Sequence, residues 1–153
     1  MFRGVSVGVG DILHCDADAL VSPANSHGFM DGGVDLAYRA FFGLGIQRRV
    51  QDLIAERWQG LLPVGEALVV PTGHMRFSRL VVAPTMETPR GIEGTDNVYR
   101  ATCAALRAAV ASASIERLAF PGMGTGVGRM DPDDAAEQMR RAIVEVIAPQ
   151  VLD

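Results

Sequence analysis

Four glycines lie within one short segment of the chain, between an apolar run and a helix-like pattern. They are Gly122, Gly124, Gly126 and Gly128. Glycine allows backbone N–H groups to turn inward and approach an anion closely, and a helix that begins just beyond adds the positive end of its dipole. The spacing therefore predicts a loop that binds phosphate groups. A flexible strand-to-helix turn with surplus glycine is the structural alternative.

This glycine loop matches neither of the two most familiar nucleotide-binding motifs. A P-loop requires a lysine after its last glycine, and the 14 basic residues of this chain are all arginine. A Rossmann G-x-G-x-x-G motif that starts at Gly122 or Gly124 requires a glycine at position 127 or 129, where the chain has Val127 and Arg129. Phosphate binding by this loop would therefore depend on an arrangement other than these two motifs.

A second loop, residues 22–35, also contains glycines and also joins a strand-like run to a helix-like pattern. Asp35 would lie in the first turn of that helix, beside a phosphate bound at Gly32 and Gly33. Asn25 offers both a hydrogen-bond donor and an acceptor. Ligands of open α/β sheets bind beyond the carboxyl ends of the strands, where both loops are expected. The two loops are thus predicted to share one ligand.

The elements that would position these loops alternate between strands and helices, which predicts an α/β fold with helices on both faces of a sheet. Strands are expected at about residues 5–9, 19–21, 67–70, 80–83 and 115–120. Helices are expected at about residues 34–43, 46–60, 95–110 and 132–149, the last with Asp131 as its N-cap. The whole chain, residues 1–153, is expected to form a single domain.

Composition limits the classes of function. With 153 residues, 48% hydrophobic and 21% charged, the chain fits one folded domain with one core. No apolar run approaches the roughly 18 residues of a membrane span, and no signal-peptide pattern is present, so a cytoplasmic protein is expected. The net charge of −4 argues against a broad nucleic-acid surface. Cys15 and Cys103 are expected to be free thiols.

Four ordered segments resemble the macrodomain family, whose members bind ADP-ribose and in many cases remove it from proteins. The segments are residues 10–12, residues 21–25 with 32–35, residues 65–67 and residues 120–127. The resemblance covers almost the whole chain. It implies a three-layer α/β/α fold with a mixed central sheet.

The resemblance also implies roles for individual residues. Asp11 would accept a hydrogen bond from the adenine amino group, and the amide of Ile12 would contact the base. The two glycine-containing loops would clamp the diphosphate, leaving Asn25 and Asp35 near the distal ribose. The implied ligand-binding residues are Asp11, Ile12, Asn25, Gly32, Gly33, Val34, Gly122, Gly124, Thr125, Gly126 and Val127.

Family members that resemble this chain at Asn25 and Asp35 release ADP-ribose from acidic side chains. The resemblance thus implies a hydrolase, with these two residues catalytic and no cofactor, that removes mono-ADP-ribose from Asp or Glu of proteins. Departure of the carboxylate builds positive charge on the ribose, which substrate phosphate oxygens can stabilise. Asp35 would hold or deprotonate a water while Asn25 fixes the ribose hydroxyls. The structural alternative is that Asp35 only favours its helix dipole.

Departures from the family pattern leave other functions open. Many hydrolytic members have an aromatic residue over the distal ribose, where this chain has Gly128. Arg129, Phe29 or Met30 could fill that gap. A non-catalytic ADP-ribose reader and an ADP-ribose-1″-phosphate phosphatase are the alternatives. Ser22 also replaces an asparagine that is common in the family.

The expected partners are ADP-ribose and mono-ADP-ribosylated proteins, without a membrane, and with nucleic acid only where it carries ADP-ribose as a substrate. The absence of lysine excludes the family branch that is associated with a catalytic lysine. A zinc-dependent branch needs clustered Cys and His residues. His14 and Cys15 are adjacent and would point to opposite faces of a strand, so no metal is expected.

Overall fold

A four-stranded mixed sheet forms the centre of the computed structural model, which describes residues 2–147. Its strand order is β2-β3-β1-β4. β1 pairs in parallel with β3 and β4, whereas β2 pairs antiparallel with β3. The carboxyl ends of β1, β3 and β4 therefore lie at the same edge of the sheet. The strands are β1 (Ala19–Ser22), β2 (Leu68–Pro71), β3 (Arg79–Val82) and β4 (Leu118–Ala119).

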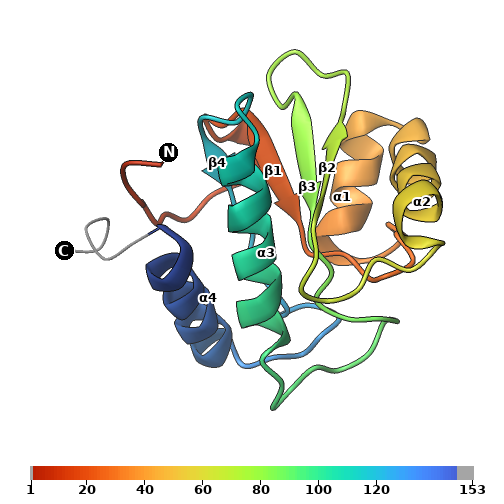
Figure 1. Ribbon diagram of the computed structural model, residues 1–153. Coiled ribbons are helices and arrows are strands. Elements are labelled where there is room, and N and C mark those ends of the chain that lie inside the picture. The colour runs from red at the N-terminus through yellow and green to blue at the C-terminus, as the bar shows by residue number, and fades with distance from the viewer. Residues whose placement is uncertain (1, 148–153) are drawn as a thin grey trace.

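Helices cover both faces of this sheet, as Figure 1 shows. The first two lie on one side and the last two on the other. Their positions agree with the helical periodicity of the sequence. The helices are α1 (Gly33–Phe42), α2 (Gly45–Trp58), α3 (Asn97–Ala111) and α4 (Pro132–Ile147), and a short 3-10 helix, η1 (Ile12–His14), precedes β1.

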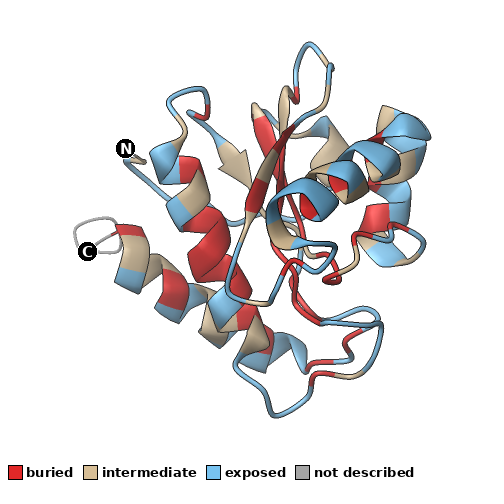
Figure 2. Cartoon of the chain, turned by 45° about the vertical axis from the view of Figure 1, so that its right-hand side comes forward, coloured by how far each residue is buried: buried red, intermediate tan, exposed pale blue. Residues whose placement is uncertain are grey.

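Neighbouring residues of β1 contribute to two separate hydrophobic cores. Leu20 packs in the cluster that contains Tyr38 of α1, and Val21 packs in the cluster that contains Val98 of α3. The buried residues in Figure 2 accordingly lie in the strands and on the inner sides of the helices. This is the three-layer α/β/α fold with a mixed sheet that the sequence predicts.

The helix ends follow the local chemistry of the sequence. Asp131 caps α4, since its Oδ2 accepts a hydrogen bond from the amide of Asp134 at 3.2 Å. α1 ends at Gly43, whose φ of 98° favours glycine. The predicted end of α4 at residue 149 falls outside the described residues. None of the helices in residues 2–147 is both long enough and apolar enough to span a membrane.

The expected strand at residues 5–9 is wrong. No strand is assigned there, and Val7 and Val9 are almost completely exposed, at 96% and 108%. Alternating valines create an apolar face, but a strand also needs a partner for its backbone, and none of the described strands pairs with this segment. Glycines at positions 4 and 8 weaken strand formation further. Strand β4 is also shorter than the expected 115–120, because only two of its residues pair with β1.

Candidate functional site

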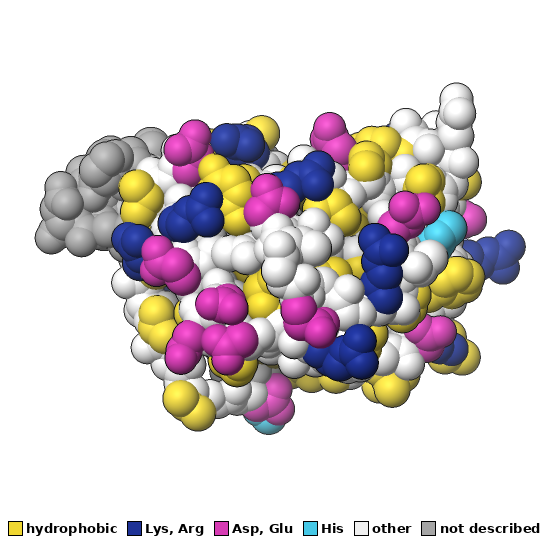
Figure 3. Space-filling model, turned by 90° about the horizontal axis from the view of Figure 1, so that it is seen from below, with side chains coloured by type: hydrophobic (Ala, Val, Ile, Leu, Met, Phe, Trp, Pro, Cys, Tyr) yellow, Lys and Arg dark blue, Asp and Glu magenta, His cyan; other side chains and the backbone are white. Residues whose placement is uncertain are grey.

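Three loops meet beyond the carboxyl ends of the parallel strands. Residues 23–32 follow β1, residues 83–96 follow β3 and residues 120–131 follow β4. The amide of Ser26 donates to the carbonyl of Met86 at 3.0 Å, which joins the first loop to the second. The loops therefore form one connected surface at the edge that is viewed from below in Figure 3.

The second loop is joined in turn to the third. The amide of Ile92 donates to the carbonyl of Gly128 at 2.8 Å. The first and third loops also approach each other directly, because a Cβ added at Gly32 would lie 3.5 Å from Cγ2 of Val127. The structure thus brings together the two glycine-containing loops that the sequence singles out.

Both loops present backbone N–H groups without partners. The N-cap of α1 is Gly32, which has no side chain to cap the amides of the first turn. In residues 122–128 no amide donates a hydrogen bond to an acceptor of residues 2–147. Such amides, with the positive end of the α1 dipole, can bind an anion without a basic side chain.

The four glycines of the third loop divide into two kinds. Gly124 has a φ of 75°, and a Cβ there would lie 2.6 Å from Cγ2 of Val98. A Cβ at Gly128 would lie 2.7 Å from the carbonyl oxygen of Gly124. Gly126 has no atom within 4 Å of such a Cβ. A Cβ at Gly122 would lie 3.3 Å from Oγ1 of Thr125, a contact that a small shift of that side chain would relieve. Gly124 and Gly128 are thus required by the packing of the loop itself, and Gly122 and Gly126 are not.

Asp35 lies in the first turn of α1, as predicted, and its side chain is buried. Its Oδ1 accepts a hydrogen bond from Oγ of Ser22 at 2.5 Å. Burial raises the pKa of Asp35 from 3.8 to about 6, against the opposing effect of the Ser22 hydroxyl. Oδ2 has no hydrogen-bond partner among the described residues. A carboxyl group with a pKa near 6 can accept a proton at physiological pH.

Sequence reasoning missed the role of Ser22, which it noted only as a departure from the family pattern. Ser22 is the last residue of β1, and Asp35 lies in the first turn of the helix that follows. Nearby, the hydroxyl of Tyr38 donates to the carbonyl of Val21 at 3.0 Å. A small hydroxyl residue at the end of a strand and a carboxylate in the next helix turn is the signal that could have revealed the pair.

Asn25 is buried, and its side chain makes hydrogen bonds within its own loop. Nδ2 donates to the carbonyl of Phe29 at 3.0 Å, and Oδ1 accepts from the amides of His27 and Phe29 at 3.1 and 3.3 Å. These bonds use most of the capacity of the side chain. Its expected contact with ribose hydroxyls stays a prediction.

Asp11 and Ile12 form a separate feature. Oδ1 of Asp11 accepts from the amide of Leu13 at 3.0 Å and thereby caps η1. The half-buried Ile12 packs against the core on the α1 and α2 side. No hydrogen bond within residues 2–147 joins this turn to either glycine-containing loop. Their expected contacts with adenine stay a prediction.

Three further residues lie within the second and third loops. The Thr85 hydroxyl is buried without a hydrogen-bond partner among the described residues. Arg129, which has a φ of 54°, places its Nε 3.8 Å from Oε1 of Glu93. Val127 is half exposed beside Gly128. The side chains near the missing aromatic position are therefore an aliphatic one and a cation.

Other features lie away from this edge. Hollows of about 520 Å³, between α2 and β2, and about 270 Å³, between α3 and α4, contain none of the predicted site residues. Cys15 and Cys103 are both free thiols, as predicted. In the described part of the chain no group of three or more His, Cys, Asp and Glu residues is arranged to hold a metal ion.

The chain shares extended sequence similarity with curated proteins. A protein of Aquifex aeolicus (strain VF5) is 38% identical over 143 residues, which cover 94% of this chain and 80% of that protein. The "Macro domain-containing protein in gbd 3'region" of Cupriavidus necator is 33% identical over 146 residues, covering 91% and 79%.

Solved structures share the fold. The macrodomain of Mycobacterium tuberculosis DarG superposes with a TM-score of 0.77 at 23% identity, covering 93% of this chain and 91% of that chain. A mutant of the Oceanobacillus iheyensis macrodomain with ADPR gives 0.78 at 21% identity, covering 92% and 76%. The family model described as "Macro domain" matches residues 21–139. The chain therefore belongs to the macro domain family.

Proposed function

We propose that the protein binds ADP-ribose and hydrolyses the ester that joins mono-ADP-ribose to Asp or Glu side chains of proteins. The observation that carries this proposal is the meeting of two amide-rich loops, at Gly32 and Val127, beside a buried carboxyl group. The Oceanobacillus iheyensis macrodomain, which shares the fold, has been solved with ADPR and with ADP.

Diphosphate binding follows from the backbone. The amides at the start of α1 and those of residues 122–128 have no acceptor in the described chain, so a diphosphate between the loops would satisfy several of them at once. Each such hydrogen bond to an anion contributes about 1.5–3 kcal/mol to the free energy of binding. This mode of binding is compatible with a chain whose net charge is −4.

The proposed reaction is a substitution at C1″ of the distal ribose, in which water replaces the carboxylate. The bond between C1″ and the ester oxygen breaks, and the carboxylate of the target side chain leaves with the electron pair. Water forms the new C1″–O bond, and its proton passes to Oδ2 of Asp35 and then to solvent. The raised pKa of Asp35, about 6, suits a base that must be ionised and still accept a proton near neutral pH.

A non-catalytic ADP-ribose reader is the second candidate, and it has observations in its favour. Asn25 and Asp35 already make hydrogen bonds within the protein, to Phe29 and from Ser22. Gly128 provides no side chain to hold the distal ribose in place. Both features are compatible with a protein that binds the ligand and leaves its linkage intact.

The test is release of free ADP-ribose from a glutamate-ADP-ribosylated protein, with calorimetry of ADP-ribose binding on the same samples. The hydrolase predicts release by the wild type, loss of release in Asp35→Ala and affinity within about tenfold, or 1.4 kcal/mol. Arg141→Ala, on α4, is the control and should release at the wild-type rate. Binding without release by the wild type would instead support the reader. Absence of binding at millimolar ADP-ribose would contradict both.

A further inference from the structure

The hollow between α2 and the edge strand β2 carries features of a binding site that the proposed function does not use. It has a volume of about 520 Å³ and lies beside a strand that pairs on one side only. Between residues 36 and 79 the chain has six arginines and three acidic residues, a net charge of +3 in a chain of net charge −4. Among the eight residues that line the hollow, three are arginines and one is acidic, so the hollow itself is positive.

One stripe of α2 gives the hollow its character. Arg49, Leu53 and Arg57 follow each other at intervals of four residues, so they lie along one face of the helix and all line the hollow. Both arginines are exposed, and Leu53 is half buried against the core. The stripe thus offers a cation at each end and an apolar centre.

The other lining residues support the same character. Arg48 adds a third cation, Val69 and Pro71 of β2 add apolar surface, and Asp52 is the acidic residue among them. Asp52 makes no ion pair within 4.0 Å with an arginine of the described residues, and neither Arg48 nor Arg57 has an acidic partner there. Their charge is available to a partner.

The spacing of the stripe fits an extended peptide. Eight helical residues separate Arg49 from Arg57 by about 12 Å along the axis, at about 1.5 Å each. In a strand, side chains four residues apart lie about 13 Å from each other and on the same face as the residue midway between them. An extended segment of the pattern acidic-x-apolar-x-acidic would therefore place its three side chains over Arg49, Leu53 and Arg57.

The edge of β2 is less suited to adding a peptide strand by backbone pairing. Nη1 of Arg49 donates to the carbonyl of Pro71 at 2.7 Å, and proline has no N–H to offer. Nucleic acid is disfavoured because the net charge of −4 opposes a polyanion and because Leu53 and Val69 give the hollow apolar surface. Recognition would thus depend on side chains of a peptide.

We propose that the hollow between α2 and β2 binds an acidic, extended segment of a partner protein, with acidic side chains four residues apart and an apolar side chain between them. The segment binds by ion pairs to Arg49 and Arg57 and by burial of its apolar side chain on Leu53. This site is separate from the loops that the proposed function uses, so either can fail alone.

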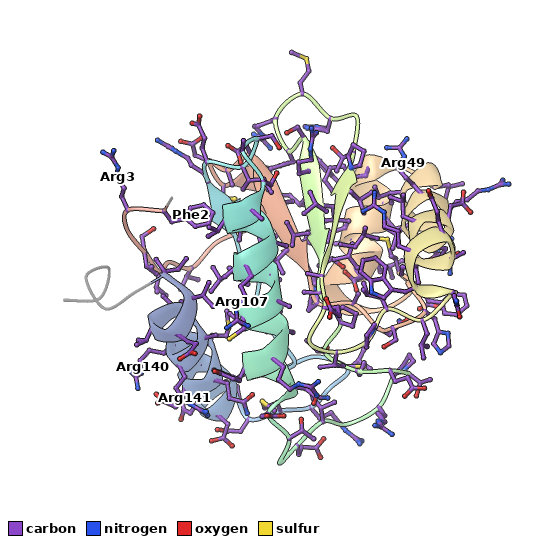
Figure 4. The ribbon with its side chains drawn as sticks, in the orientation of Figure 1. Phe2, Arg3, Arg49, Arg107, Arg140 and Arg141 are labelled. Atoms are coloured by element: carbon purple, nitrogen blue, oxygen red, sulfur yellow. The ribbon has the colours of Figure 1, made fainter. Side chains whose placement is uncertain are left out.

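The experiment is fluorescence anisotropy with a labelled peptide that contains Glu-Ser-Leu-Ser-Glu. Saturable binding by the wild type is expected, and Arg49→Glu with Arg57→Glu should weaken it at least tenfold. Because Arg49 also bonds to Pro71, Arg57→Glu alone is the second variant, expected to weaken binding several-fold with an unchanged melting temperature. The control with the same charge change is Arg140→Glu with Arg141→Glu on α4, far from α2 in Figure 4. It should bind as the wild type does.

Three outcomes would overturn the proposal. The first is the absence of saturable peptide binding by the wild type, and the second is an equal loss of peptide binding in the α4 variant. The third is displacement of the peptide by an oligothymidine whose phosphate concentration equals the carboxylate concentration of the peptide. A peptide with Gln for both Glu residues should bind at least tenfold more weakly. ADP-ribose binding is measured in parallel and should be the same in all variants, which separates this test from that of the proposed function.

Discussion

Replacement of Ser22 by alanine tests the proposed role of Asp35 directly. The hydroxyl of Ser22 donates to Oδ1 of Asp35 at 2.5 Å and favours the ionised carboxylate, whereas burial favours the neutral acid. A hydrogen bond to a charged group contributes about 1.5–3 kcal/mol, and one pKa unit corresponds to about 1.4 kcal/mol. Ser22→Ala should therefore raise the pKa of Asp35 by one to two units, from about 6 toward about 7–8.

The consequence appears in the pH dependence of turnover. Near neutral pH the ionised fraction of Asp35 would fall from about nine tenths to half or less. The rate of ADP-ribose release is measured between about pH 5 and pH 9. The acid limb of this pH–rate profile should move to higher pH by at least one unit. At high pH, where Asp35 is ionised in both proteins, the rates should converge.

Ser26→Ala is the matched control for this experiment. Ser26 is also buried in the first loop, but its hydroxyl donates to the carbonyl of Met86 at 3.4 Å and does not contact Asp35. Its acid limb should stay at the wild-type position. If the limb of Ser22→Ala stays there as well, Asp35 is not the base, and the reasoning from its environment is refuted. A uniform loss of rate at every pH would indicate that Ser22 has only a structural role.

The remaining predictions concern stability and binding. Because the folded-state pKa of Asp35 lies above its ordinary 3.8, its stabilising contribution is complete below about pH 4 and is lost as pH rises through about 6. Asp35→Asn should thus raise the free energy of unfolding at pH 7.5 by about 3 kcal/mol. Urea denaturation at about pH 4 and at pH 7.5 measures this effect, and the same variant should abolish turnover. Gly128→Ala, whose Cβ would meet a backbone oxygen at 2.7 Å, should lower that free energy by about 1–3 kcal/mol, and Gly126→Ala by less than about 0.5; equal effects would contradict the packing argument. Asn25→Asp keeps the two hydrogen bonds that Oδ1 accepts from the amides of His27 and Phe29 but replaces the donor Nδ2 by an oxygen that faces the carbonyl of Phe29, so the free energy of unfolding should fall by about 1–3 kcal/mol, measured by urea denaturation, and no change would contradict the observed loop hydrogen bonds.

Hydrophobic periodicity, together with residues that begin or end helices, was sufficient to predict most of the fold from the sequence. The four helices were predictable because each has an apolar stripe, and residues such as Asp131 and Gly43 mark their ends. The strand at residues 5–9 was not, since alternation describes one face of a segment and says nothing about whether a neighbour exists to pair with it.

The candidate site was predictable only at the level of loops. Glycine spacing and strand ends were enough to anticipate that residues 22–35 and 122–128 meet, because parallel strands end at one edge. The partnership of Ser22 and Asp35 joins residues 13 positions apart, so it depends on how β1 and α1 lie in the fold, and the strand-end hydroxyl with a carboxylate in the next helix turn is its only sequence signal. The same holds for Asn25, whose side chain turns into its own loop.

The hydrogen bond between Ser22 and Asp35 fastens together the two ends of the first loop, across 13 positions of the chain. With the strand end and the helix start fixed in this way, substitutions at the exposed positions of the segment between them, such as Phe29 and Asp31, need not displace the carboxyl group. Phe29 and Asp31 are therefore positions at which the sequence can diverge during evolution while the carboxyl group of Asp35 keeps its place.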